Sequence, residues 1–239
     1  MPSYGDDLSH VHDQGFASLA AGAAGVILET LESRAIERGK LVDLGCGSGT
    51  TAAPVAAAGH AVLGIDQSSA MLALARKRCP EGKFRRASLL DVELPACDVV
   101  SAIGEVLNYA FDPRMGMGAL ERLFRRVHAA LRPGGSLLFD VVTTRTNRSG
   151  RGAREGRDWA VLVEWHTDRA RRRLTRKLTI FRRVGSVWRR RREVHVQHLF
   201  EAAAIERLLR KSGFTVRRTR RYGDVLLLPG RSGFVARKR

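Results

Sequence analysis

The sequence predicts an α/β protein with a doubly wound, mostly parallel sheet and an antiparallel insertion late in the chain. Three observations lead to this prediction. Short apolar runs alternate with helix-like segments over residues 40–143, as parallel strands and crossover helices do. The first of these runs continues into the glycine-rich turn "GCGSG". Residues 159–199 carry three long runs rich in Val, Thr, Trp and Arg, which is typical of antiparallel strands.

The expected elements follow in chain order. An Ala-rich stretch at 9–35 has apolar residues at helical spacing and forms an N-terminal helical cap, 1–39, that Gly39 closes. Thr50 or Thr51 is expected to cap the helix that ends at Gly59. Strands are expected at 40–44, 60–66, 83–88, 97–104 and 136–142, and helices at 50–58, 68–79 and 118–135.

Three further segments complete the predicted organisation around a core at 40–143. Residues 145–157 are polar and rich in Gly and Arg, which predicts an exposed loop. Runs at 159–166, 172–184 and 187–199 predict an antiparallel three-stranded insertion within 144–199, acting as a substrate cap or a dimer contact. Residues 200–239 are expected to add a helix and a β-hairpin that complete a seven-stranded core sheet.

Charge is distributed unevenly along the 239 residues, whose formal net charge is +18. Residues 1–143 hold 14 Lys+Arg and 16 Asp+Glu, whereas residues 144–239 hold 28 and 8. A basic surface can attract RNA or phosphorylated ligands. Because the chain has 36 Arg but only 6 Lys, we favour a GC-rich coding bias on a solvated surface as the explanation.

The cysteines and the hydropathy pattern indicate a cytoplasmic protein. Cys46, Cys79 and Cys97 are odd in number and lack CxxC spacing, so we expect free thiols and no metal site. No run approaches the roughly 18 apolar residues that span a bilayer. The polar start of the chain lacks the pattern of a signal peptide.

The stretch "LVDLGCGSGT", residues 41–50, predicts a ligand-binding turn after the first strand. A dinucleotide fingerprint starting at Gly45 and Gly47 would need Gly or Ala at position 50, where Thr50 stands. Asp43 would also repel a pyrophosphate, whereas it would tolerate an ammonium group. A tight turn without any ligand is the alternative interpretation of these residues.

The pattern Asp-x-Gly-x-Gly-x-Gly resembles motif I of the class I S-adenosylmethionine-dependent methyltransferases. Four later segments resemble the same family in order and spacing: "GIDQSSAMLALAR", "ASLLDVELP", "CDVVSAIGEVLNYAF" and "LRPGGSLLFDV". The resemblance covers residues 35–143, and residues 195–239 more weakly. It implies a Rossmann-like fold, S-adenosylmethionine as cofactor and S-adenosylhomocysteine as product.

The resemblance also implies which residues hold the cofactor. Asp66 matches the acid that accepts the ribose hydroxyls, and Ser88 stands where the family commonly has an Asp beside the adenine, which leaves Leu89 and Asp91 as other candidates. The full set of implied cofactor-binding residues is Asp43, Gly45, Cys46, Gly47, Gly49, Asp66, Gln67, Met71, Ser88, Leu89, Asp91, Gly104 and Glu105.

Catalytic candidates are fewer, because the methyl donor is already activated and the protein mainly aligns the reactants. Glu105 and Asn108 follow the fourth strand, and His195 shares one face of the last insertion strand with Gln197. We expect methyl transfer to nitrogen or oxygen of a small molecule, by a monomer or homodimer. The alternatives are an RNA or protein methyltransferase that uses the basic C-terminal half, and a non-catalytic protein that binds S-adenosylmethionine.

Overall fold

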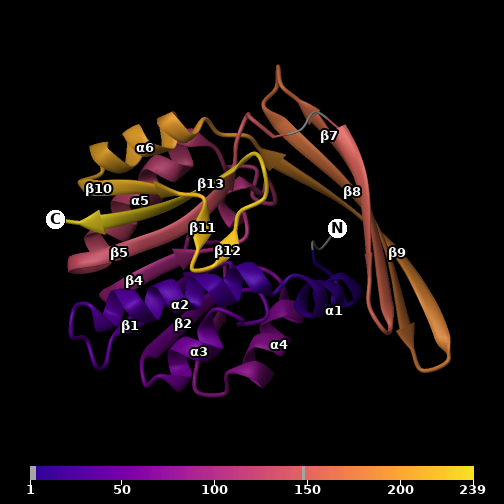
Figure 1. The fold of residues 1–239 in the computed structure, drawn as a ribbon, viewed down its shortest axis with the longest axis horizontal. Helices are drawn as coiled ribbons and strands as arrows, with labels where there is room; N and C mark the ends of the chain where they lie inside the picture. The colour runs from indigo at the N-terminus through magenta and orange to yellow at the C-terminus, as the bar shows by residue number, and fades with distance from the viewer. Residues whose placement is uncertain (1–3, 147–148) are drawn as a thin grey trace.

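The computed structural model describes residues 4–146 and 149–239. Part of the expected cap, residues 1–3, and two positions of the expected loop, Asn147 and Arg148, lie outside the described residues. Figure 1 shows a twisted sheet covered by helices, with a second, elongated sheet beside it. In the described residues no single helix is long and apolar enough to cross a membrane, and one bent helix pair passes that test on length and composition only.

The central sheet has seven strands in the order β10-β13-β5-β4-β1-β2-β3, which confirms the predicted fold class. All neighbours from β3 to β5 are parallel, whereas β13 is antiparallel to both β5 and β10. The strands are β1 (Lys40–Leu44), β2 (Ala61–Asp66), β3 (Lys83–Arg86), β4 (Cys97–Ala102), β5 (Leu131–Val142), β10 (Phe214–Thr219) and β13 (Arg231–Lys238).

Helices pack on both faces of this sheet, as the alternating pattern predicts (Figure 1). On one face α2 (Ser18–Glu32) and α3 (Ala52–Ala57) bury Ile27 and Val55 against Leu41 of β1. On the other face α5 (Met117–Ala130) and α6 (Ala202–Lys211) bury Phe124 and Ile205 with the opposite side chains of the strands. A further helix, α4 (Ser69–Arg78), follows β2.

The N-terminal cap contains two helices where the Ala-rich stretch suggested one. The helix α1 (Asp6–Gly15) ends at Phe16, whose backbone leaves the helical region, and α2 starts at a bend of 63°. The predicted Thr cap of α3 is right in position, because Thr51 is the N-cap residue, but the Thr51 hydroxyl bonds Ala20 of α2 rather than its own helix.

The insertion has four antiparallel strands, so the expected three-stranded sheet is wrong by one strand. Its members are β6 (Ser149–Glu155), β7 (Trp159–Asp168), β8 (Arg173–Val184) and β9 (Val187–His198). The additional strand, β6, lies within the predicted loop 145–157. Its Gly150 pairs with Trp165, and a Cβ on Gly150 would lie only 2.2 Å from the Trp165 ring. The glycines that suggested a loop therefore allow close packing of an indole.

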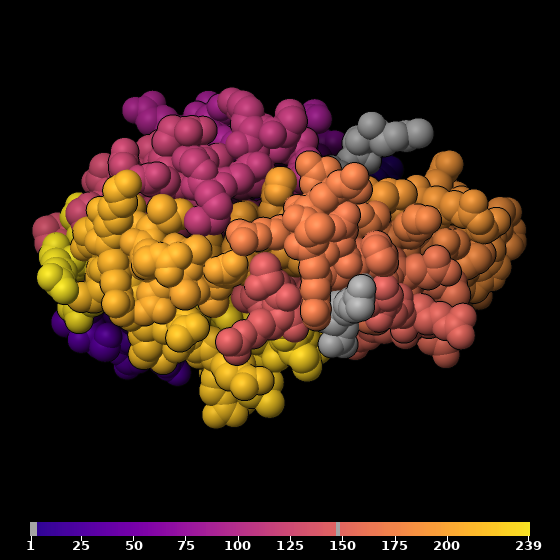
Figure 2. All heavy atoms as spheres, turned by 90° about the horizontal axis from the view of Figure 1, so that it is seen from above, coloured from indigo at the N-terminus to yellow at the C-terminus, as the bar shows by residue number. Residues whose placement is uncertain are grey.

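One face of the insertion sheet is held by α1. Leu8 and Val11 of α1 form an apolar cluster with Trp159, Val161 and Ile180 of the sheet. The buried Asp7 carboxylate adds ion pairs to arginines of β8 and β9, namely Arg182, Arg189 and Arg191. In Figure 2 the insertion forms one end of the molecule and the central sheet with its helices forms the other.

A short hairpin of β11 (Arg221–Tyr222) and β12 (Val225–Leu226) lies between β10 and β13 in the chain. Its Tyr222 is fully buried and packs with Leu227 against Ala23 of α2. The hairpin therefore anchors the C-terminal strands to the N-terminal cap, near the end of the sheet where β5 and β13 meet.

Candidate functional site

A pocket lies at the carboxyl ends of β1, β2 and β4, where ligands bind in open α/β sheets. Its walls come from the core strands and their loops, and also from the N-terminal segment through Tyr4 and His12. Eight of the residues that the sequence implied for the cofactor line it: Gly45, Gly47, Asp66, Gln67, Met71, Ser88, Leu89 and Gly104.

The glycine turn has three residues with positive φ, at +68° for Gly45, +53° for Gly47 and +79° for Gly49. A Cβ on Gly45 would clash with Val106, and one on Gly49 would press on Ala75 of α4. At Gly47 a Cβ would meet only the sulfur of Met71, at 3.9 Å. Gly45 and Gly49 therefore serve close packing of the chain, whereas Gly47 leaves open space toward the pocket.

Asp66 ends β2 and turns its carboxylate into the pocket. It accepts hydrogen bonds from the backbone N–H groups of Gly47 at 2.9 Å and Ser68 at 2.8 Å. Burial raises the pKa of the Asp66 carboxyl, while these backbone donors work in the opposite direction. Each carboxylate oxygen keeps acceptor capacity for a ligand hydroxyl. Ser68, rather than Asp66, provides the side-chain cap of α4.

Asp43 is buried beneath the glycine turn and does not line the pocket. Its carboxylate accepts a hydrogen bond of 2.6 Å from the Ser101 hydroxyl on β4. Burial raises the pKa of Asp43 to about 7, although the Ser101 bond opposes that rise. Asp43 therefore bonds β1 to β4 just before the glycine turn and does not line the pocket itself.

Four other implied cofactor residues, Cys46, Gly49, Asp91 and Glu105, also lie outside the pocket lining. Cys46 is a buried free thiol, as are the other two cysteines. Asp91 is exposed and forms an ion pair of 2.7 Å with Arg114, which also binds Asp112. Ser88 lines the pocket, and its hydroxyl donates to Asp112 at 3.0 Å. Asp112, which also lines the pocket, is a polar neighbour that the sequence did not single out.

Glu105 occupies a strained turn at the end of β4. Its φ is +63°, and its backbone N–H and that of Gly104 both donate to the Asp140 carboxylate on β5. The Glu105 carboxylate is buried between Arg176 of β8, at 2.8 Å, and Arg231 of β13. Although burial opposes ionisation, the two guanidinium groups hold the pKa of Glu105 below its usual value. Such a carboxylate is a poor proton acceptor near neutral pH.

Asn108 is fully buried and outside the pocket lining. Its amide group donates to the carbonyl oxygens of Val142 and His198 and accepts from the Val142 N–H. The residue therefore joins the loop after β4, the end of β5 and the end of β9. With every one of these polar atoms occupied by backbone, the structure gives Asn108 a structural role in place of the catalytic role that the sequence suggested.

His195 lies on the face of β9 that is turned toward the core and is buried. Its Nε2 lies 2.9 Å from Glu193, whose carboxylate also accepts the backbone N–H groups of Tyr4 and Gly5. The imidazole packs on Tyr4, with ring centroids 5.1 Å apart, and meets Tyr109 and Phe111 edge-on. These three aromatic residues line the pocket, so they separate His195 from it by one layer.

Tyr4 and Tyr109 face each other in the wall of the pocket, with their hydroxyl oxygens 3.0 Å apart. Burial raises the pKa of both phenols, so both hydroxyls stay neutral. His12 lines the same wall, and burial lowers its pKa to about 4, which keeps its imidazole neutral at physiological pH. The sequence alone gives no reason to choose His12 over His10, which lies two residues earlier.

Four charged residues near the pocket were not predicted from the sequence: Arg176, Arg231, Glu193 and Asp140. Strand periodicity could have found Arg176, because the register pairs it with His195 and so places both on one face. Arg231, Glu193 and Asp140 carry no comparable local signal, since their partners are distant in the chain.

The strand order, the glycine turn after β1 and the acid after β2 together define a Rossmann-like protein with a nucleoside-type site at the carboxyl ends of its strands. Residues 41–135 match the family described as "Methyltransferase domain". This match covers the glycine turn, Asp66 and the loop after β4. These residues therefore form a methyltransferase domain, and the segment resembles the class I S-adenosylmethionine-dependent methyltransferases.

Known proteins resemble the chain in sequence and in structure. A trans-aconitate 2-methyltransferase from Delftia acidovorans is 37% identical over 120 residues, which are 48% of this chain and 42% of that protein. The chain therefore spans less than half the length of this relative. DesVI from Streptomyces venezuelae has a TM-score of 0.81 at 22% identity, with 99% of this chain and 100% of that chain covered. An amino pentose methyltransferase from Micromonospora echinaspora, solved with S-adenosylmethionine bound, has a TM-score of 0.77 at 20% identity, with 100% and 99% covered. At these identities, the structural likeness establishes the shared fold.

Proposed function

We propose that this protein transfers the methyl group of S-adenosylmethionine to a nitrogen or oxygen atom of a small molecule. The observation that carries the proposal is a single pocket in which Asp66 and the glycine turn meet the aromatic wall of Tyr4, Tyr109 and Phe111. S-adenosylmethionine supplies an activated sulfonium methyl, so the protein needs only to bind, align and exclude water.

The residues of the donor side fit this cofactor. Gly47 leaves room for close approach of a ligand, and Asp66 offers acceptor oxygens for ribose hydroxyls. Ile65, Met71 and Leu89 give the neighbouring wall an apolar surface suited to a purine. Asp43, held by Ser101, directly precedes the turn and is buried behind the pocket lining.

On the acceptor side, the residues of this chain exclude water and accept a proton. Tyr4, Tyr109 and Phe111 close the pocket with aromatic surface and two neutral hydroxyls. His195, which Glu193 orients and whose ring packs on Tyr4 and Tyr109 behind the pocket wall, is the proposed acceptor of the proton that an amine or hydroxyl substrate releases. Glu105 contributes its negative charge and does not act as the base.

The names of similar proteins support a small-molecule acceptor. One relative is named for trans-aconitate, and one structural neighbour for an amino pentose. Trans-aconitate offers oxygen atoms for methylation, whereas an amino pentose also offers a nitrogen atom. Both nitrogen and oxygen are therefore included as acceptor atoms.

Calorimetric titration with S-adenosylmethionine tests the donor side, and an Asp66→Ala variant is the matched comparison. Incubation with labelled S-adenosylmethionine and a fractionated small-molecule extract tests turnover, with mass spectrometry of the labelled product. Absence of binding at millimolar S-adenosylmethionine would overturn the proposal. Binding without S-adenosylhomocysteine formation from any acceptor pool would instead favour the non-catalytic alternative.

A further inference from the structure

Two arginines from distant parts of the chain converge on one carboxylate behind the tyrosine pair. Arg176 of β8 places Nη1 2.8 Å from Glu105 Oε2, and Arg231 at the start of β13 places Nε against Glu105 Oε1. Within residues 4–146 and 149–239, Glu105 is the only carboxylate within ion-pair distance of either guanidinium. Both arginine side chains are about a fifth exposed, at 21% and 18%, so solvent reaches them.

The charges in this cluster do not balance. Each guanidinium has five N–H donors and uses one nitrogen on Glu105, so most donors lack an acceptor in the described part of the protein. A second acid, Asp140, interacts electrostatically with Arg231, but both its oxygens accept backbone N–H groups. Burial raises the pKa of Asp140 to about 7, so it carries only part of a charge at neutral pH. A positive charge therefore remains beside the pocket.

Gln197 supplies a second, independent observation. Its side chain is fully buried, and its Nε2 donates to Glu105 Oε2 at 2.9 Å. Its Oε1 has no hydrogen-bond partner among the described residues, whereas buried amide oxygens are ordinarily paired. The cluster thus offers unfilled guanidinium donors and an unfilled amide acceptor side by side.

The position of the cluster relates it to the acceptor and not to the methyl donor. Glu105 lies four residues before Tyr109, which belongs to the aromatic wall of the pocket. Arg176 acts electrostatically on both Tyr4 and Tyr109. The donor residues Gly47 and Asp66 have no contact with either arginine in the described structure.

We propose that the small-molecule acceptor carries an anionic group, a carboxylate or a phosphate, which Arg176 and Arg231 bind, and a neighbouring N–H or O–H that Gln197 Oε1 accepts. This inference rests on the proposed function and names the class of its acceptor. Guanidinium groups bind both anions through paired N–H donors. Glu105 occupies part of the arginine pair and keeps it charged and oriented.

Calorimetric titration of the protein, saturated with S-adenosylhomocysteine, tests the site with inorganic phosphate and malonate as probes. We expect binding of at least one anion, weakened at least ten-fold by Arg176→Gln and by Arg231→Gln. Glu105→Gln removes the competing carboxylate, so we expect it to tighten anion binding several-fold, which a merely structural role for the arginines would not do. Arg192→Gln is the matched control and should leave binding unchanged, because Arg192 is exposed and has no ion pair with any residue that the structure describes.

The outcomes separate this inference from the proposed function. Absence of anion binding to both the parent and Glu105→Gln overturns the anionic subsite, as does equal binding by the parent and both arginine variants. Loss of S-adenosylhomocysteine binding by the parent overturns the proposed function instead. Thermal unfolding of each variant shows whether it folds. If one arginine variant does not fold, anion binding by the other arginine variant and by Glu105→Gln decides whether the anionic subsite exists. Stronger binding of phosphate or of malonate identifies the anion.

Discussion

The donor side and the acceptor side of the pocket are built in different ways. Donor residues come from short segments at the ends of adjacent parallel strands: 45–49, 65–71, 87–89 and 103–104. Acceptor-side residues come from the whole length of the chain, with Tyr4 and Arg231 at its extremes. The first arrangement follows from the topology of a parallel sheet, whereas the second depends on tertiary contacts that have no local pattern.

The two sides also differ in polarity. The donor side has two carboxylates that line the pocket, Asp66 and Asp112, in a mostly apolar slot with backbone donors. The acceptor side combines Glu105, two arginines and the His195–Glu193 pair around aromatic rings. Tyr4 joins the sides, because its N–H donates to Glu193 and its carbonyl oxygen accepts from the Ser68 hydroxyl. Variants on each side should therefore separate methyl transfer from cofactor binding.

The largest effect is expected at His195. His195→Gln keeps an amide near Glu193 but removes the proton acceptor, so kcat should fall about 10²- to 10⁴-fold. S-adenosylmethionine affinity should stay within about two-fold, because His195 does not line the donor pocket. Product formation and calorimetry measure the two quantities. His166→Gln, at an exposed site bonded to Ser149, is the control, and an unchanged kcat in His195→Gln would refute the assignment.

Asp66→Asn should give the next largest effect, on binding rather than turnover. The substitution removes charge-assisted hydrogen bonds worth about 3 kcal/mol in total, which corresponds to roughly 100-fold in S-adenosylmethionine affinity. Calorimetry measures this loss. Asp91→Asn is the comparison, because Asp91 is exposed and paired with Arg114, and it should change affinity less than two-fold. If both variants lost affinity equally, the pocket would extend beyond the walls described above.

The same contrast explains what the sequence could predict. Gly47, Asp66 and Leu89 could be predicted from the sequence, because strand ends place them at one edge of the sheet. Asn108 was misread because its sequence position near the methyl donor does not reveal that Val142 and His198 occupy its amide. The strand β6 was missed because Gly-rich composition ordinarily indicates a loop, and only its pairing with β7 shows why Gly150 is needed.

A smaller effect is expected from the pH dependence of stability, through Asp43. Its pKa is about 7 when folded and 3.8 in an unfolded chain, so the folded protein holds the proton more tightly. This contribution to stability is complete below pH 4 and is lost as pH rises through 7. The free energy of unfolding of the parent should fall by about 2 kcal/mol more than that of Asp43→Asn between pH 5 and 8.

Urea unfolding at several pH values checks this prediction. Asp43→Asn should keep its bond to Ser101 and retain the part of the pH dependence that belongs to Asp140, whose pKa is also raised to about 7. Identical pH profiles for the parent and Asp43→Asn would contradict a protonated Asp43. Because Asp43 lies on the donor side and Asp140 on the acceptor side, the double variant should lose both contributions additively.

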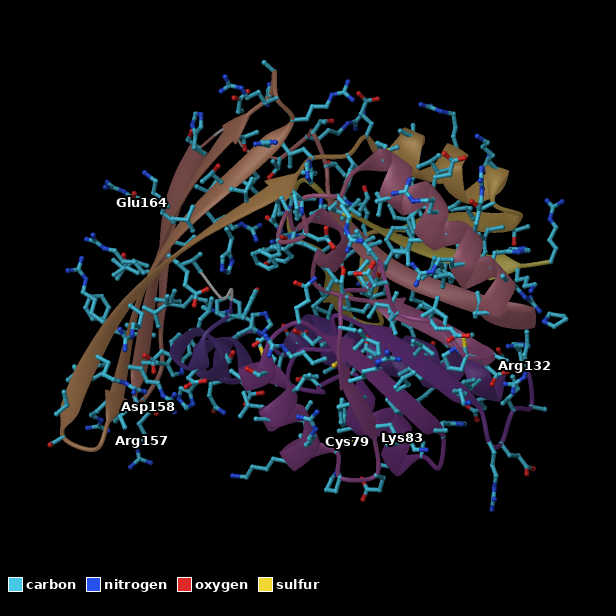
Figure 3. The ribbon with its side chains drawn as sticks, turned by 180° about the vertical axis from the view of Figure 1, so that it is seen from behind. Cys79, Lys83, Arg132, Arg157, Asp158 and Glu164 are labelled. Atoms are coloured by element: carbon cyan, nitrogen blue, oxygen red, sulfur yellow. The ribbon has the colours of Figure 1, made fainter. Side chains whose placement is uncertain are left out.

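The smallest effect is expected on the outer face of the insertion sheet. Strand alternation places Trp188, Arg190 and Arg192 on this face. Figure 3 shows Glu164, which the register places on the same face, turned away from the core. Trp188 is 51% exposed, and neither arginine has an ion pair in the described structure. Arg190→Gln with Arg192→Gln should change the free energy of unfolding by less than about 0.5 kcal/mol and leave cofactor affinity unchanged.

This double variant also tests the RNA alternative. If the basic face is a solvated surface, the parent should show no single-stranded RNA affinity that the variant lacks, at any salt concentration. An affinity that falls steeply with salt and decreases in the double variant would assign the face to RNA. Such a result would move the acceptor from the pocket of Tyr4 and Tyr109 to the far side of the sheet. The aromatic wall, the arginine pair and the buried His195 all lie on the side of the sheet turned toward the core, and they favour the small molecule.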